Sequence, residues 1–228
     1  MSDVLKFLST VPGIAVLIGL LAAAFLLVTL TNWRLLVLAL GAQYLLLGLM
    51  LTRAVPLELA AVKALVGVMI CPVLYITARR VRWGHSGDEP EEEPLPPVSR
   101  WRGWLSALIG PGLPVRALAA VLTAVLSLSL ALRNPLPVIS DPVAARDLTI
   151  GTLSLVLLGL LNVILNENPL KVGIGLLTLL SGFELFYTAI EPTLTLVGLL
   201  GFTNLIIALA ISYLTTAWAT HPAREVEP

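Results

Sequence analysis

Residues 32 to 56 read NWRLLVLALGAQYLLLGLMLTRAVP, and residues 168 to 192 read NPLKVGIGLLTLLSGFELFYTAIEP. The two segments have the same length, and each begins with Asn and ends with Pro. Between these boundaries each carries an apolar run of about 20 residues, the length that crosses a bilayer as a helix. The match predicts two copies of one transmembrane helix, and therefore an internal repeat.

The composition of the whole chain agrees with a membrane setting. Of the 228 residues, 57% are hydrophobic and 12% are charged, and the mean hydropathy is +0.95. Such a chain is an integral membrane protein. The formal net charge is zero, so nucleic acid is not an expected partner. Lipid is.

Seven windows are apolar enough to span the bilayer, and they predict an all-α polytopic membrane protein with about seven transmembrane helices. The windows are residues 12–31, 33–53, 56–77, 114–132, 148–166, 169–189 and 192–217. Two three-helix units (1–78 and 146–219) would be joined by an extra helix (114–133), and an acidic, proline-rich linker with an interfacial helix (79–113) and a tail (220–228) would lie outside them. The extra crossing lets both units insert in the same direction, as parallel repeats.

Basic residues favour one side of this arrangement. With seven spans, one side holds nine Lys and Arg residues and the other holds Lys6, Arg53, Arg133 and Arg146. Positively charged loops stay in the cytoplasm. We therefore expect a multi-pass protein of the cell inner membrane with its N-terminus outside and its C-terminus in the cytoplasm.

The three-helix unit resembles a known family. The segment NPLKVGIGLLTLL (168–180), a short turn and the small-residue helix LVGLLGFTNLIIALAISYLTT (196–216) are similar to the small K subunit of bacterial complex I, to the C subunit of multisubunit Na⁺/H⁺ antiporters and to hydrogenase-4 component E. The resemblance implies a redox-inactive subunit of a proton- or sodium-translocating assembly. Its partners would be larger antiporter-like or other membrane subunits, and direct quinone binding is not predicted.

The sequence departs from that family at two functional positions. Family members of the complex I type carry one glutamate in the second helix of the unit and another in the third. Here Thr178 or Ser181 stands near the first of these positions and Asn204 near the second. An asparagine side chain cannot take up and release a proton near neutral pH. The resemblance therefore does not transfer the usual pair of proton-carrying groups.

Two ionisable side chains nevertheless lie inside predicted spans. Lys63 follows Pro56 by seven residues and Glu184 precedes Pro192 by eight, so both lie about 10 to 12 Å deep at 1.5 Å per residue. Because a bare charge is costly in hydrocarbon, one hypothesis pairs them across the third and sixth helices. Alternatively, Lys63 snorkels to the interface, and Glu184 is protonated or faces a partner subunit.

A functional relay through one or both charges would use further intramembrane polar residues to hold water: Gln43, Tyr44, Tyr187, Thr203 and Asn204. Nothing in the sequence predicts a catalytic residue, a metal site or a cofactor, because His85 and His221 lie in the linker and the tail and no nucleophile or phosphate-binding motif is present. Cys71 is the only cysteine and is expected to serve packing. Gly173, Gly175 and Gly182 are expected to allow close helix approach.

Three classes of function remain open. The first is the ion-translocating subunit that the resemblance implies. The second is a structural accessory subunit of another respiratory or photosynthetic complex, in which the polar residues satisfy one another. The third is a stand-alone small-solute transporter with a midplane site between parallel repeats.

Overall fold

The computed structural model describes residues 13–52, 55–81, 113–133 and 142–220. Over these residues the chain forms seven α-helices and no strand, which confirms the all-α prediction. The helices are α2 (Gly13–Thr29), α3 (Trp33–Leu51), α4 (Leu57–Arg80), α6 (Leu113–Arg133), α7 (Pro142–Leu165), α8 (Pro169–Ile190) and α9 (Leu194–Thr220).

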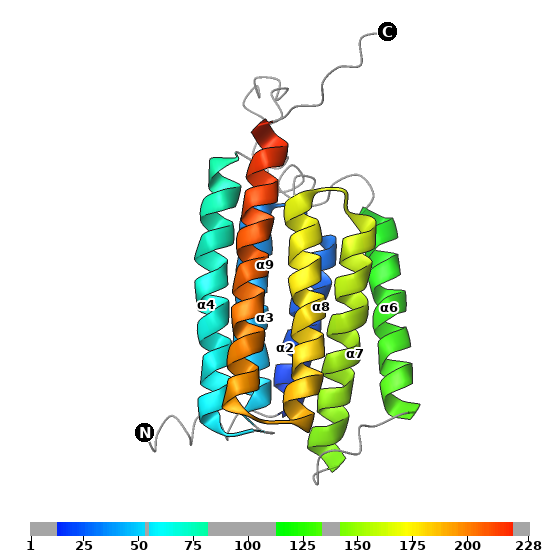
Figure 1. Ribbon diagram of the computed structural model, residues 1–228. Helices are drawn as coiled ribbons and strands as arrows, with labels where there is room; N and C mark the ends of the chain where they lie inside the picture. Colours follow the sequence, from blue (N-terminus) through cyan, green and yellow to red (C-terminus); the bar gives the residue numbers. More distant parts are fainter. Residues whose placement is uncertain (1–12, 53–54, 82–112, 134–141, 221–228) are drawn as a thin grey trace, which may run out of the picture.

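Successive helices run in opposite directions (Figure 1). In that view α2, α4, α7 and α9 run upward, and α3, α6 and α8 run downward. The first unit (α2, α3 and α4) and the second unit (α7, α8 and α9) therefore have the same orientation, because α6 supplies one extra crossing between them. The prediction of two parallel three-helix units is confirmed. Below, the lower end of the bundle is the end where α3 finishes and α4 begins.

The two units are packed as two rows of helices. In the first row α3 lies between α2 and α4, and in the second α8 lies between α7 and α9. Across the rows α2 packs on α7, α4 packs on α9, and α3 lies opposite α8. Each helix thus faces its own counterpart in the other unit. α6 stands at one end of both rows, against α7 and α2.

The matched asparagines begin the two middle helices in the same way. The side-chain oxygen of Asn32 accepts a hydrogen bond from the backbone N–H of Arg34 at 3.1 Å. The side chain of Asn168 accepts from the N–H of Leu170 at 3.3 Å. In both helices this side chain satisfies one of the N–H groups that lack a partner in the first turn. The repeat in the sequence is therefore also a repeat of local structure.

Glycines set the close contact between α7 and α8. A Cβ atom added to Gly159 would lie 2.5 Å from the backbone nitrogen of Leu179, and one added to Gly175 would lie 2.9 Å from the backbone nitrogen of Val163. Gly182 is equally close to α7, whereas Gly173 faces α9, where its Cβ would lie 2.5 Å from Ile211. The expectation of close packing at Gly173, Gly175 and Gly182 is confirmed.

Two helix boundaries differ from the sequence prediction. α7 begins at Pro142, six residues before the apolar window at 148. Pro is favoured in the first turn of a helix, and the helix continues through the charged residues Arg146 and Asp147 because backbone hydrogen bonding does not stop where apolarity does. α9 likewise continues to Thr220. Pro72 lies inside α4, which remains one helix.

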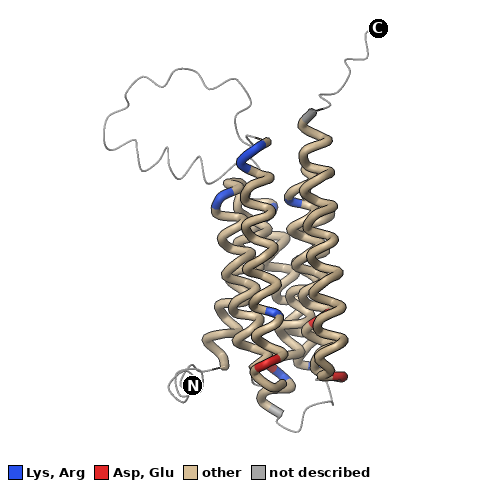
Figure 2. The backbone as a smooth tube through the Cα atoms, turned by 60° about the vertical axis from the view of Figure 1, so that its left-hand side comes forward, with Lys and Arg blue, Asp and Glu red and all other residues tan. Residues whose placement is uncertain are grey.

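Six of the seven helices are long and apolar enough to cross a bilayer, and the 17 described residues of α2 form a shorter apolar helix. Basic residues gather at the upper end (Figure 2), namely Arg34, Arg79, Arg80, Arg116 and Lys171. The predicted interfacial helix and the acidic linker lie outside the described residues.

Candidate functional site

An ion pair joins the two units inside the bundle. Lys63 of α4 and Glu184 of α8 form a salt bridge, and both side chains are 4% exposed. Beyond each other, neither Lys63 Nζ nor Glu184 Oε2 has a hydrogen-bond partner among the described residues. The pair therefore carries most of the electrostatic compensation that each charge requires at this depth.

Both residues reach the pair from equal depth. Lys63 is six residues from the lower end of α4 and Glu184 is six residues from the lower end of α8, or about 9 Å at 1.5 Å per residue. The snorkelling alternative for Lys63 is wrong, because its side chain is buried against the second unit. The structure brings together the two side chains that the pairing hypothesis requires.

An aromatic ring also lies beside the Lys63 ammonium group. The centroid of the Tyr44 ring is 5.1 Å from Lys63 Nζ, within the range of a cation–π contact. Gly67 makes room for this ring, since a Cβ atom there would lie 2.4 Å from Tyr44 Cβ. The ammonium group thus contacts a carboxylate of the second unit and an aromatic ring of the first.

Further buried polar groups at a similar depth along their helices have no hydrogen-bond partner among the described residues. Tyr44 Oη lies near the Ser181 hydroxyl, but the two oxygens do not meet the geometry of a hydrogen bond. The side-chain amides of Gln43 and Asn204 are also buried and have no hydrogen-bond partner among the described residues. We call Gln43, Tyr44, Lys63, Ser181, Glu184 and Asn204 the polar layer. It draws on α3, α4, α8 and α9.

The remaining predicted polar residues lie elsewhere. Thr178 is buried, and its hydroxyl donates to the backbone oxygen of Ile174 at 2.9 Å. Tyr187 is 38% exposed and stacks on Phe183, with ring centroids 5.9 Å apart. Thr203 is exposed and donates to the backbone oxygen of Leu199. Tyr187 and Thr203 therefore do not join the polar layer, because they lie on the outward faces of α8 and α9.

Sequence reasoning missed buried polar groups in α7 and directly after it. Asn166 Nδ2 donates to Asn162 Oδ1 at 2.7 Å near the upper end. The hydroxyls of Ser154 in α7 and Ser127 in α6 lie 2.8 Å apart and are buried. The spacing of four residues between the two asparagines is the available signal, since in a helix that continued through Asn166 such residues would lie on one face. The serine pair has no comparable signature.

The described residues hold no group of three or more His, Cys, Asp or Glu side chains that could bind a metal ion. Comparison with protein-family models, with curated proteins and with solved structures found no match for this chain. A functional assignment therefore depends on the geometry of the polar layer.

Proposed function

We propose that this chain is a membrane subunit of a multisubunit proton- or sodium-translocating complex, and that its polar layer forms part of the ion path. The observation that carries the proposal is the buried Lys63–Glu184 pair together with the unpartnered polar groups at a similar depth. The resemblance of the three-helix unit to the K subunit of complex I and its relatives points to the same class. The chain itself is redox-inactive in this proposal.

The unpartnered groups favour an ion path over a purely structural role. Buried polar groups that only stabilise a fold are usually satisfied by one another or by ordered water. In the polar layer the Gln43 and Asn204 amides, the Tyr44 hydroxyl and the Ser181 hydroxyl have no partner among the described residues. Their donors and acceptors are available to water or to a moving ion, which favours the first function over the structural accessory subunit.

The polar layer is confined to one part of the membrane depth. Its members lie between about 9 and 15 Å from the lower end, counted along their helices at 1.5 Å per residue. Glu184, Ser181 and Thr178 are spaced by three residues and therefore follow one face of α8. Because the hydrocarbon core is about 30 Å thick, the layer reaches only to its middle. Another subunit has to supply the second half of a path, which supports a complex over a stand-alone transporter.

The charge distribution supports an orientation. Five basic residues lie at the upper end, whereas Glu58, Asp147 and Glu191 lie at the lower end, with Arg133 and Arg146. Positively charged ends face the cytoplasm. In the proposed orientation the upper end is cytoplasmic, the membrane is the inner membrane of the cell, and the polar layer lies in the outer half of the bilayer.

Purification and ion transport test the proposal together. The chain, tagged and extracted in mild detergent, should co-purify with larger membrane subunits, identified by mass spectrometry. Inverted membrane vesicles carrying that complex should pump fewer ions when Glu184 is replaced by Gln. The matched control is Glu191→Gln, the same substitution at the exposed end of the same helix, which should leave pumping unchanged.

A second variant keeps the test informative if Glu184→Gln prevents assembly of the complex. The double variant Lys63→Met with Glu184→Gln removes both charges and leaves no buried charge uncompensated. Full pumping by an intact complex that carries either variant would contradict the ion path. Isolation of the chain without any other polypeptide would contradict membership of a complex.

A further inference from the structure

The two units are related by a translation. Asn168 follows Asn32 by 136 residues, and this shift carries α3 onto α8 and α4 onto α9. A rotation would place α2 against α9, but α2 packs on α7 and α4 packs on α9. The second unit is therefore the first unit moved sideways. In such an arrangement one side of each unit, its back face, covers the opposite side, the front face, of the next unit.

Exposure along α3 and α8 shows this relation residue by residue. The counterpart of a residue is the one 136 positions along the chain. Leu38 is 71% exposed, and its counterpart Ile174 is fully buried. Leu45 is 52% exposed, and its counterpart Ser181 is fully buried. On the opposite side the relation reverses, since Leu47 is fully buried in α3. Its counterpart Phe183 is 47% exposed in α8.

The third helices behave in the same way. Val68 and Tyr75 of α4 are 56% and 43% exposed, whereas their counterparts Asn204 and Ile211 in α9 are 1% and 6% exposed. Conversely, Ile70 is fully buried, and the identical residue 136 positions later, Ile206, is 50% exposed. The front face of the first unit carries Leu38, Leu45, Val68 and Tyr75 and is exposed. The equivalent face of the second unit is buried within the chain.

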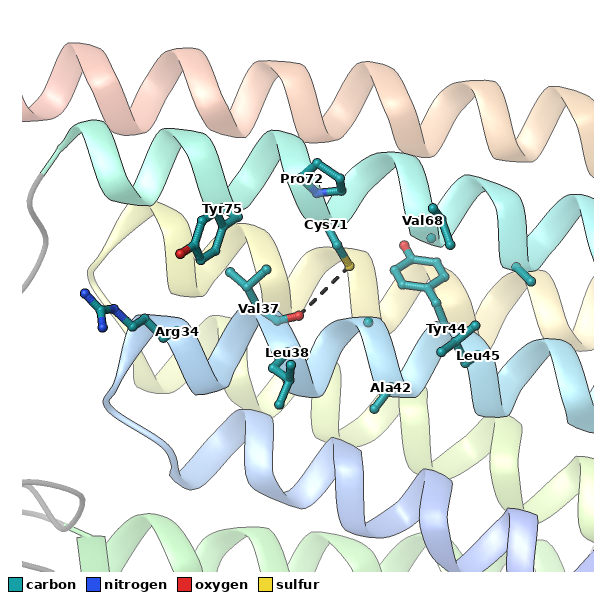
Figure 3. Close-up of a pocket in the computed structure, with 13 residues that line it drawn as sticks. Arg34, Val37, Leu38, Ala42, Tyr44, Leu45, Val68, Cys71, Pro72 and Tyr75 are labelled. Atoms are coloured by element: carbon teal, nitrogen blue, oxygen red, sulfur yellow. Dashed lines mark hydrogen bonds between the residues drawn. The ribbon is translucent and has the colours of Figure 1, made fainter. Parts of the chain in front are cut away.

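The open front face contains an apolar groove of about 650 Å³ between α3 and α4 (Figure 3). Small residues, Gly41, Ala42 and Ala64, line it. In Figure 3 the Tyr44 ring rises from α3 toward α4, and Cys71 points from α4 toward the backbone oxygen of Val37. The groove is a recess suited to large apolar side chains from a facing helix.

The open back face of the second unit presents such side chains. Phe183 and Phe202 are 47% and 60% exposed. Their counterparts in the first unit, Leu47 and Val66, are smaller, and they belong to the face that packs inside the chain. Helix association in membranes depends on close packing of knobs into recesses, since lipid is as apolar as the side chains. The chain therefore carries both halves of one further interface.

We infer that a second copy of this chain docks head to tail, with the back face of its α8–α9 pair on the α3–α4 groove of the first copy. An interface between two different faces does not close on itself when the relation is a translation, so it generates a linear stack. Such a stack keeps one front face and one back face at its ends, where other subunits can bind. The inference does not depend on the proposed ion path.

The internal interface predicts the register of the external one. A Cβ atom on Gly201 of α9 would lie 2.7 Å from Val66 Cγ2 of α4, so these two positions touch across the units. Phe202 is the counterpart of Val66, and Leu65 is the counterpart of Gly201. The equivalent contact between two copies therefore places Phe202 of one copy against Leu65 of the next. Leu65 is 60% exposed, as a docking position requires.

Disulfide cross-linking tests this register. Two differently tagged copies are expressed together in a Cys71→Ser background, one with Leu65→Cys and the other with Phe202→Cys. At equal expression, oxidation of native membranes should shift up to about half of the chain to a dimer that carries both tags, because random mixing places the two different copies together at half of the docking faces. When one chain carries both cysteines, oxidation should give a ladder of longer multimers, because the stack is open-ended.

The matched control replaces Phe202→Cys by Val125→Cys on α6. Val125 is 60% exposed and, like Phe202, lies eight residues from the lower end of its helix, or about 12 Å at 1.5 Å per residue. This pair should remain monomeric on oxidation. Equal cross-linking by Val125→Cys and Phe202→Cys would show random collision and overturn the inference.

Counting copies of the unmodified chain covers the case in which a cysteine variant fails to accumulate. Single-molecule photobleaching of a fluorescent fusion in native membrane vesicles should show two or more copies in each spot. Single copies, with phospholipid in the groove by native mass spectrometry, would overturn the inference. Cross-linking of Leu65→Cys only to a different polypeptide would also overturn it, while leaving the proposed function intact.

Discussion

Leu40 of α3 is fully buried, whereas Leu176, the identical residue at the same position of α8, is 37% exposed. Their helices have the same cap, the same length of chain to the following proline and the same direction. The difference arises only from the side of the unit to which the neighbouring unit is added. The two leucines therefore form an internal comparison of packed and unpacked surroundings.

Truncation of these two leucines to alanine should lower the free energy of unfolding by different amounts. Leu40→Ala leaves a cavity between tightly packed helices and should lower the free energy of unfolding by about 2 to 5 kcal/mol. Leu176→Ala removes an outward-facing side chain and should cost much less in detergent, where copies are apart. Reversible unfolding of the purified single chain measures both values, and equal losses would contradict the translational packing.

The Lys63–Glu184 pair should show strong coupling in a double-mutant cycle. Lys63→Met or Glu184→Leu alone leaves one buried charge uncompensated and should cost about 3 to 5 kcal/mol. The double variant should be more stable than either single variant, because neither charge remains. Additive losses in unfolding free energy would mean that the two side chains do not compensate each other.

Gly159 should not tolerate a methyl group. Gly159→Ala places Cβ against the backbone of Leu179, which cannot move aside without displacing α8, so a loss of about 1 to 3 kcal/mol is expected. Gly198→Ala is the control, since a Cβ atom there meets nothing within 4 Å and alanine favours a helix. Thermal unfolding should rank Gly198→Ala at or above the unmodified chain and Gly159→Ala well below it.

The ring and the hydroxyl of Tyr44 should have separate effects. Tyr44→Phe keeps the π face beside Lys63 and removes a hydroxyl that has no hydrogen-bond partner among the described residues, so stability should change little. Tyr44→Leu also removes the cation–π contact, worth about 2 kcal/mol when desolvated. If the polar layer conducts ions, Tyr44→Phe should slow transport in inverted vesicles without reducing the amount of assembled complex.

Reporter fusions should reveal the orientation. Alkaline phosphatase fused after Arg133, at the lower end of α6, should be active, since that end faces the outside in the proposed orientation. The same enzyme fused after Thr220, at the end of α9, should be inactive, and a fluorescent protein fused there should mature. The opposite pattern would reverse the orientation and move the polar layer to the cytoplasmic half of the membrane.

Sequence reasoning predicted the helices and the depth of the charges from simple physical rules. Apolar length predicted seven helices, and the matched Asn and Pro boundaries predicted which residues of α3 and α8 correspond. Counting from Pro56 and Pro192 placed Lys63 and Glu184 at the same level. These predictions needed only the rise of a helix and the thickness of a bilayer.

The lateral arrangement could not be predicted in this way. Helices that are apolar on every side carry no periodic signal for the face that turns inward. Tyr187 and Thr203 therefore looked equivalent to Tyr44 and Asn204, although the structure places the former two outside. The order of the rows, and with it the translation between units, depends on matches of shape such as Gly159 against the backbone of α8. Such matches cannot be recognised in a single sequence.

The pairing of charges across the two units has a consequence for biosynthesis. Glu184 follows Lys63 by 121 residues, a delay of about 6 to 24 s at the usual 5 to 20 residues per second. During that interval the ribosome has delivered the lysine to the membrane and has not yet made its counter-ion. We expect the newly synthesised first half to keep the Lys63 ammonium group at the bilayer surface or inside the insertion machinery until α8 is inserted and Glu184 can pair with it.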